Sequence, residues 1–190
     1  TSAPFLLPLL FQVGFGFDIL HSSMLVLVVF LGNLSMKMIT TPILQKFGYR
    51  PVLIVNGALC VLSLISFACI EPDTTLWVLV PMLLISGMTR SMQFTSLGTL
   101  AYADVPKPLM SDANGLFSTM TQLSMAMGVT VGALGIRIGH AFSSHWSVQA
   151  PGFDYRVAFL LSGAVCLFGL IDAVRLPKGA ADHFITRRAS

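Results

Sequence analysis

The chain has 190 residues, of which 55% are hydrophobic and only 10% charged, and its net charge is +3. Soluble domains carry roughly 25% charged residues, so this composition excludes most cytosolic enzymes, a disordered chain and a nucleic-acid-binding arm. It predicts an all-α membrane protein instead. A membrane helix needs about 20 apolar residues, so the length accommodates about six spans and leaves no room for a soluble catalytic domain.

Turn residues divide the chain into six predicted transmembrane helices and a basic tail. The predicted helices are residues 3–17, 22–44, 51–70, 75–102, 112–138 and 154–176, and the tail is 177–190. Pro51 fits the first turn of the third helix, where a proline removes no helical hydrogen bond. The stretch from Gly139 to Phe153 is typical of an interfacial loop. The first helix is short for the hydrocarbon, so we expect the first crossing to begin upstream.

The basic residues predict the orientation, because cytoplasmic loops retain an excess of Lys and Arg. With a cytoplasmic start, Arg137 and Arg156 lie outside, and seven basic residues lie inside: Lys46, Arg50, Lys107, Arg175, Lys178, Arg187 and Arg188. We therefore expect the amino end and the carboxyl tail to be cytoplasmic. The net charge then reflects topology, so the expected partner is the lipid bilayer and not nucleic acid.

Two basic residues, Lys37 and Arg90, remain inside predicted helices. A charge near mid-bilayer costs about 2.5–3.5 kcal/mol, so it is either held by a partner or functional. At about 1.5 Å per residue, both lie at one depth. Asn33 shares a helical face with Lys37, and Gln93 shares one with Arg90, which predicts the wall of a substrate path. In the alternative interpretation, Lys37 snorkels to the headgroups and backbone carbonyls hold Arg90.

Polar and small residues in the first and fifth helices are further candidates. Gln12 is a lone amide that either bonds a neighbouring helix or contacts substrate. Gln122 lies at the edge of a polar half-helix that would line the same path. Close helix packing is predicted where glycines recur at short spacing, at Gly128, Gly132, Gly135 and Gly139.

The sequence lacks the motifs of common enzymes. It contains no G-x-S-x-G elbow, no H-E-x-x-H pair and no Walker-type glycine loop. Its three cysteines, Cys60, Cys69 and Cys166, do not have metal-ligand spacing. We therefore expect no catalytic residue, no metal and no cofactor. Every carboxylate is expected at or near a membrane surface, so none is placed at mid-membrane to carry a proton.

The turn after the second predicted helix resembles a motif of the major facilitator superfamily. Its sequence, TPILQKFGYR from Thr41 to Arg50, is similar to the second copy of the family's G-x-L-a-D-r-x-G-r-r. Lys46, Gly48 and Arg50 match, whereas Thr41 and Gln45 replace the glycine and the aspartate. The stretches Pro4 to Gly16 and Gln122 to Val129 further resemble the fourteen-span drug:proton antiporter branch, which contains bacterial multidrug exporters.

This resemblance implies the carboxyl-terminal half of a major facilitator fold, built as two inverted three-helix repeats in the cell inner membrane. It implies proton-coupled export of lipophilic or amphipathic small molecules by alternating access. The proton-carrying acid and the opposite wall of the cavity would come from the missing amino-terminal half. The alternative is a truncated or non-transporting membrane protein that only packs with other helices. The gene sequence upstream of Thr1 would discriminate between the two.

Overall fold

The structure is a computed structural model that describes residues 3–70, 74–102, 105–146 and 152–175. Helices dominate, and the described residues contain no strand. The helices are α1 (Ala3–Leu9), a π-helical turn η1 (Leu10–Gly14), α2 (Ile19–Phe47), α3 (Tyr49–Ala68), α4 (Leu76–Ala101), a 3-10 turn η2 (Lys107–Leu109), α5 (Met110–Trp146) and α6 (Phe153–Arg175). The predicted basic tail, 177–190, lies outside the described residues.

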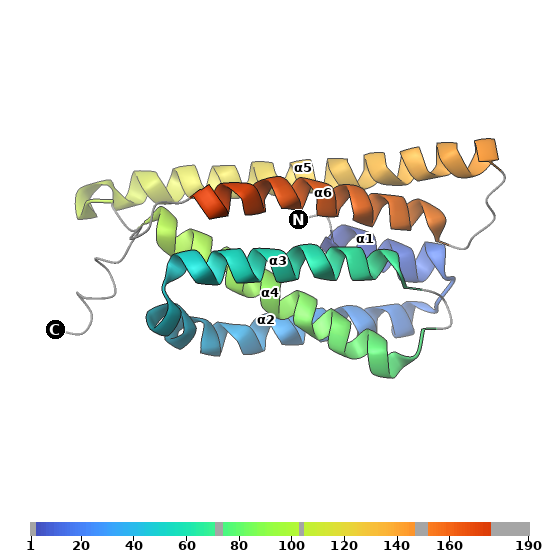
Figure 1. Cartoon of the computed structure of the whole chain (residues 1–190), viewed down its shortest axis with the longest axis horizontal. Helices are drawn as coiled ribbons and strands as arrows, with labels where there is room; N and C mark the ends of the chain where they lie inside the picture. The colour runs from blue at the N-terminus through green and yellow to red at the C-terminus, as the bar shows by residue number, and fades with distance from the viewer. Residues whose placement is uncertain (1–2, 71–73, 103–104, 147–151, 176–190) are drawn as a thin grey trace.

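The long helices lie roughly along one axis, and successive helices run in opposite directions, so α2 and α4 point the same way (Figure 1). Within the described residues, four helices, α2, α3, α5 and α6, are long and apolar enough to cross a membrane. Helix α4 has 26 residues, which reach about 39 Å at 1.5 Å per residue, but it includes the charged Arg90. The predicted all-α membrane fold is confirmed.

Most helices lie within three residues of their predicted bounds, and the first and fifth differ by more. The first was predicted as one helix over 3–17, but α1 ends at Leu9 and a π-helical turn follows, in which the Phe15 N–H donates to the Leu10 carbonyl at 2.8 Å. The interfacial loop predicted from Gly139 is wrong over its first part, because α5 continues to Trp146. Gly139 does not have a positive φ, and its missing side chain lets α5 pack on α6, so nothing ends the helix there.

The tightest packing joins α2 to α4 through two glycines. A Cβ atom added at Gly32 would collide with the Leu84 carbonyl, and one added at Gly87 would collide with the Val29 carbonyl. Each glycine thus contacts the backbone three residues before the other glycine. Membrane helices associate by such close packing, because lipid tails provide no hydrophobic force between apolar helices.

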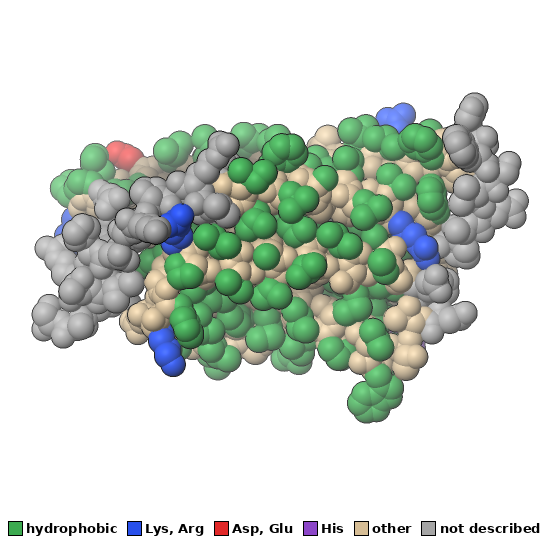
Figure 2. Space-filling model, in the orientation of Figure 1, with side chains coloured by type: hydrophobic (Ala, Val, Ile, Leu, Met, Phe, Trp, Pro, Cys, Tyr) green, Lys and Arg blue, Asp and Glu red, His purple; other side chains and the backbone are tan. Residues whose placement is uncertain are grey.

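The core is concentrated where α1 and η1 meet the other helices. Leu6 and Phe11 are fully buried there, together with Leu83 of α4 and Phe159 of α6. By contrast, the outer surface is largely apolar. Figure 2 shows hydrophobic side chains over the middle of one face, with Lys and Arg near its two ends. This distribution is what a bilayer requires of a protein that crosses it.

Candidate functional site

A buried amide joins α3 to α4. Asn56 is only 4% exposed, and its Nδ2 donates to the Thr89 carbonyl at 2.7 Å and to Gln93 Oε1 at 2.8 Å. A backbone carbonyl can only accept, so the Asn56 atom that faces it is the amide nitrogen. The Gln93 atom facing that same nitrogen is therefore the side-chain oxygen. The Thr89 carbonyl therefore fixes the orientation of both side-chain amides, that of Asn56 and that of Gln93.

This arrangement leaves the Gln93 amide nitrogen available. Gln93 is half-buried, and within the described residues its Nε2 makes no hydrogen bond and is not sealed from solvent. The neighbouring Thr89 hydroxyl is already used, because it donates to the Ile85 and Ser86 carbonyls of its own helix at 3.0 and 3.1 Å. The Gln93 oxygen is directed toward Asn56, so Gln93 offers its amide nitrogen, a donor, to an incoming group.

Arg90 lies three residues before Gln93, on the same side of α4. It is half-buried, and its guanidinium is within electrostatic range of the Cys60 thiol on α3 and the Cys166 thiol on α6. Within the described part of the chain, no hydrogen bond or ion pair involves Arg90. The positive charge is uncompensated there. We call Asn56, Arg90 and Gln93 the α3–α4 polar cluster.

The two α2 candidates differ in how the structure places them. Lys37 is exposed and Asn33 is half-buried, whereas the face of α2 that packs inward carries Gly32, Met36 and Thr40. The Asn33 backbone nitrogen lies beside Gly87 of α4. Among the described residues, the structure does not bring Lys37 into contact with Arg90, so it does not assemble the two predicted basic groups into one site.

The remaining path candidates, Gln12 and Gln122, are both exposed. Gln12 lies within the π-helical turn η1, and Gln122 lies in the first half of α5. π-helical turns are rare and are frequent at functional sites. The structure places neither amide against the α3–α4 polar cluster.

The glycine stripe of α5 divides into two parts. A Cβ at Gly135 would lie 2.5 Å from Ala158 Cα of α6, and a Cβ at Gly139 would lie 2.6 Å from Asp154 Cα. These glycines bring the two helices into contact, and the Ser143 hydroxyl adds a hydrogen bond to the Asp154 carboxylate at 3.3 Å. Gly132 is also buried, whereas Gly128 is half-buried.

The loop motif lies in the turn between α2 and α3. Gly48 has φ +78°, a conformation that other residues adopt at a cost, and its N–H caps α2 by donating to the Leu44 carbonyl at 3.0 Å. Lys46 is exposed, with its Nζ 5.6 Å from the centre of the Phe47 ring. Arg50 is half-buried in the first turn of α3. The need for a positive φ explains the glycine of this motif.

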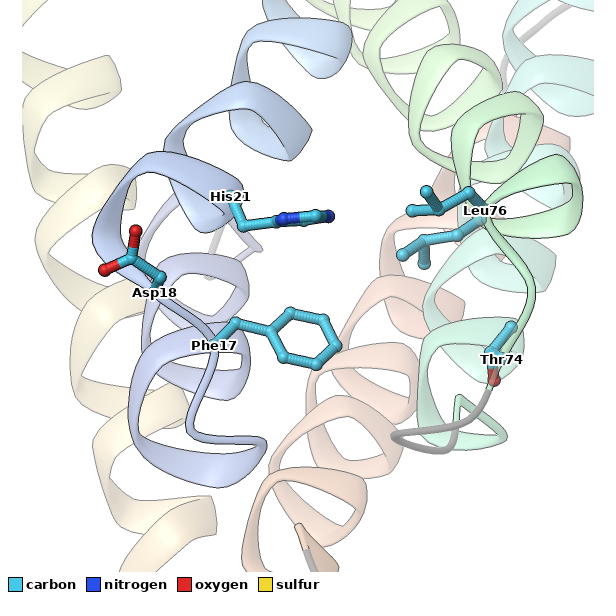
Figure 3. Close-up of a pocket in the computed structure, with 6 residues that line it drawn as sticks. Phe17, Asp18, His21, Thr74 and Leu76 are labelled. Atoms are coloured by element: carbon cyan, nitrogen blue, oxygen red, sulfur yellow. The ribbon is translucent and has the colours of Figure 1, made fainter.

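A small cavity of about 230 Å³ lies between the starts of α2 and α4. Phe17 and His21 point into it toward Leu76, whereas the Asp18 carboxylate points away (Figure 3). The ring centres of Phe17 and His21 are 6.0 Å apart. The sequence analysis did not identify this cavity, because it is formed by two segments that are distant in the chain.

Asn56 was also missed, although a signal was present. It is an amide within an apolar helix, as Gln12 is, and an intramembrane amide needs a hydrogen-bond partner. The glycine pair Gly32 and Gly87 has no such signal, because neither glycine belongs to a short repeated spacing in its own helix.

Residues 1–129 match a family model described as Major Facilitator Superfamily. A protein of Serratia proteamaculans (strain 568), with the printed name "Putative multidrug resistance protein MdtD", is 36% identical over 172 residues, which cover 90% of this chain and 35% of that protein. A protein of the same name from Klebsiella pneumoniae subsp. pneumoniae is 30% identical over 189 residues, covering 97% of this chain and 39% of that protein. The chain thus spans less than 40% of the length of these relatives. No solved structure matches it significantly.

Proposed function

Because this chain belongs to the Major Facilitator Superfamily, we propose that it forms the carboxyl-terminal half of a secondary transporter that exports lipophilic or amphipathic drugs. The observation that carries this proposal is the α3–α4 polar cluster, an uncompensated arginine beside an available amide donor within an apolar bundle. Intramembrane polar groups of this kind mark substrate paths. The names of the relatives, which refer to multidrug resistance, support the substrate class.

In this proposal, Arg90 and Gln93 of α4 line the substrate path with Asn33 and Lys37 of α2. Gln12 and Gln122 provide further polar contacts. A binding cavity with apolar walls and a few polar groups suits amphipathic compounds, because the walls bury the apolar body and the polar groups fix its orientation. Alternating access would expose this path first to one side of the membrane and then to the other.

The proton carrier is proposed to lie outside this chain, in an amino-terminal half. Among the described side chains, the carboxylates are Asp18, Asp112 and Asp154, at the starts of α2, α5 and α6. Relatives more than twice as long as the matched region have room for such a half. A full-length sequence without an intramembrane Asp or Glu would contradict this part of the proposal.

Six transmembrane helices, arranged as two inverted repeats of three, are proposed to cross the inner membrane with both ends of the chain in the cytoplasm. Lys46 and Arg50 at the α2–α3 turn and Lys107 at η2 support this orientation, since basic residues favour the cytoplasmic side. Lys178, Arg187 and Arg188 support it from the sequence alone, because they lie outside the described residues.

The proposal is tested with the complete transporter in proteoliposomes under a proton gradient. Arg90→Ala and Gln93→Ala are each expected to slow efflux of the transported drug by about tenfold or more, because each removes a polar contact in a low-dielectric site. Thr99→Ala is the matched control. Thr99 is exposed on the same helix, and its hydroxyl donates only to the Thr95 carbonyl at 2.9 Å.

Two outcomes contradict different parts of the proposal. Unchanged efflux of every substrate by both variants, at normal expression, removes Arg90 and Gln93 from the path. No proton-driven efflux by the wild-type protein favours the alternative of a membrane protein that only packs with other helices. The gene upstream of Thr1 provides an independent check, since an in-frame set of further helices is expected there.

A further inference from the structure

We propose that the α3–α4 polar cluster selects organic anions. Arg90 and Gln93 would bind the carboxylate of an amphipathic compound, and Asn56 would hold Gln93 in the orientation that donates. This inference rests on the proposed function, because it specifies the substrate class of that same site. The Arg90 charge could either bind an anionic substrate or pair with an acid elsewhere in the protein. The inference assigns it the first of these two roles.

The first step is the orientation of Gln93. A free glutamine side chain presents either its oxygen or its nitrogen to a ligand, because the amide group rotates. Here Asn56 Nδ2 occupies Gln93 Oε1 at 2.8 Å while also donating to the Thr89 carbonyl at 2.7 Å. Rotation of the Gln93 amide would bring two amide nitrogens together and lose that bond. Gln93 therefore presents Nε2, a donor, toward the unoccupied side.

The second step is the charge beside that donor. Arginine has five N–H donors and no acceptor, and the groups within electrostatic range of Arg90 are the Cys60 and Cys166 thiols. Among the described side chains, the carboxylates are Asp18, Asp112 and Asp154 at the starts of helices, and none of them forms an ion pair with Arg90. Arg90 and the Gln93 amide nitrogen thus form a group of hydrogen-bond donors with net positive charge. The ligand chemistry that satisfies both groups is an anionic oxygen.

The third step is the apolar surface next to the donors. Phe94 follows Arg90 by four residues, so it lies on the same side of α4, and it is 51% exposed. Its ring centre is 6.2 Å from that of Phe117 on α5. An aromatic body placed against Phe94 would leave its acidic group near Arg90. The site therefore fits an aromatic carboxylate better than a small inorganic anion.

The test measures binding of two probes with the same ring system, 2-naphthoate and its neutral carboxamide 2-naphthamide, to the purified complete transporter by equilibrium dialysis. The wild-type protein is expected to bind the anion about tenfold tighter or more, since hydrogen bonds to charged groups are the stronger ones. Arg90→Ala is expected to abolish this preference, and Arg90→Lys to restore part of it, because lysine keeps the charge without the bidentate fork.

Gln93→Glu gives the sharpest comparison. A glutamate oxygen still accepts from Asn56, so the α3–α4 contact is kept, but the outward donor becomes an anionic oxygen. Preference for 2-naphthoate is expected to fall about tenfold or more, with little change for 2-naphthamide. Asn56→Leu frees the Gln93 amide to rotate and is expected to reduce the preference a few-fold. Thr99→Ala is expected to leave the ratio of the two affinities unchanged.

The ratio of the affinities for 2-naphthoate and 2-naphthamide tests this inference, and transport in proteoliposomes tests the proposed function. Equal affinities of the wild-type protein for both probes would overturn the inference. It would also be overturned if Arg90→Ala weakened both probes equally, which is the result expected of an arginine that pairs with an acid elsewhere. Absence of proton-driven transport in proteoliposomes would contradict the proposed function, whereas the dialysis ratio would still decide whether the cluster selects anions.

Discussion

At the scale of single residues, Asn56 connects two helices with one nitrogen. Both of its amide hydrogens are used on α4, one on the Thr89 carbonyl and one on Gln93 Oε1. Hydrogen bonds between membrane helices contribute about 0.6 kcal/mol on average and up to about 1.7 kcal/mol. An unpaired buried acceptor adds to the loss when the donor is removed.

Asn56→Leu is therefore expected to lower the free energy of unfolding of the complete transporter by about 1–2 kcal/mol. Leucine has a similar volume, so the change mainly removes the two bonds. Unfolding in increasing concentrations of a denaturing detergent measures the effect. Thr99→Val is the control, because Thr99 is exposed and its hydroxyl donates only to the Thr95 carbonyl of its own helix. Equal stability of Asn56→Leu and wild type would show that the contact contributes nothing.

The sequence predicted part of this site for a clear reason. Arg90 and Gln93 are conspicuous because polar residues within an apolar helix are costly. Their partners were not predictable, since a sequence does not fix the rotation of α3 against α4 that brings Asn56 to Gln93. The predicted cavity wall shared by Lys37 and Arg90 relied on their equal depth and on the polar residues that share a helical face with each, and it stays a prediction. Depth does not decide which way a side chain points, and in the structure Lys37 is exposed.

At the scale of helices, the α2–α4 contact depends on two absent side chains. Gly32 and Gly87 lie so close to carbonyl groups of the facing helix that a Cβ atom at either position collides with backbone. Backbone cannot move aside as the tip of a flexible side chain does. The helices must then separate, which loses packing contacts along their length.

Gly32→Ala and Gly87→Ala are each expected to destabilise the protein by about 1–3 kcal/mol. Gly115→Ala and Gly169→Ala are matched controls in α5 and α6, since nothing lies within 4 Å of a Cβ at either site. Alanine favours helix over glycine by about 1 kcal/mol, so the controls are expected to be neutral or stabilising. Detergent unfolding compares all four. Destabilisation of the controls to the same extent would contradict the explanation from packing.

Helix ends were less predictable than helices. The sequence analysis ended the fifth helix at residue 138 because the stretch from Gly139 to Phe153 is typical of an interfacial loop, but α5 continues to Trp146. Gly139 is there a contact residue that faces Asp154. The sequence analysis predicted Gly139 both as a packing glycine and as the start of a loop, and only the neighbouring helix decides between these two roles.

At the scale of the whole molecule, the amino-acid composition was enough to predict an all-α membrane protein. The directions of the helices provide a test of its topology in the membrane. Lys46 is exposed near the end of α2, and His140 is exposed near the end of α5. Because successive helices run in opposite directions, these two positions lie at opposite ends of the bundle (Figure 1).

In a complete transporter with Cys60, Cys69 and Cys166 replaced by alanine, Lys46→Cys is expected to react with a membrane-impermeant thiol reagent only from the cytoplasmic side. His140→Cys is expected to react only from outside, since the excess of basic residues places the α2–α3 turn inside. Labelling intact cells and inverted vesicles measures both. The reverse pattern would overturn the proposed orientation, and labelling of both positions from one side would contradict the helix directions.

The reciprocal glycine contact also has a symmetry. Gly32 contacts the backbone three residues before Gly87, and Gly87 contacts the backbone three residues before Gly32. Because α2 and α4 also point the same way (Figure 1), exchanging the two helices leaves this contact unchanged. Two identical subunits meet in this manner across a twofold axis, which here runs along the bundle. The proposed inverted repeat needs an axis in the membrane plane, and it would relate α2 to α5. If the proposed repeat holds, the self-complementary crossing comes from packing between two unlike sequences and not from the repeat.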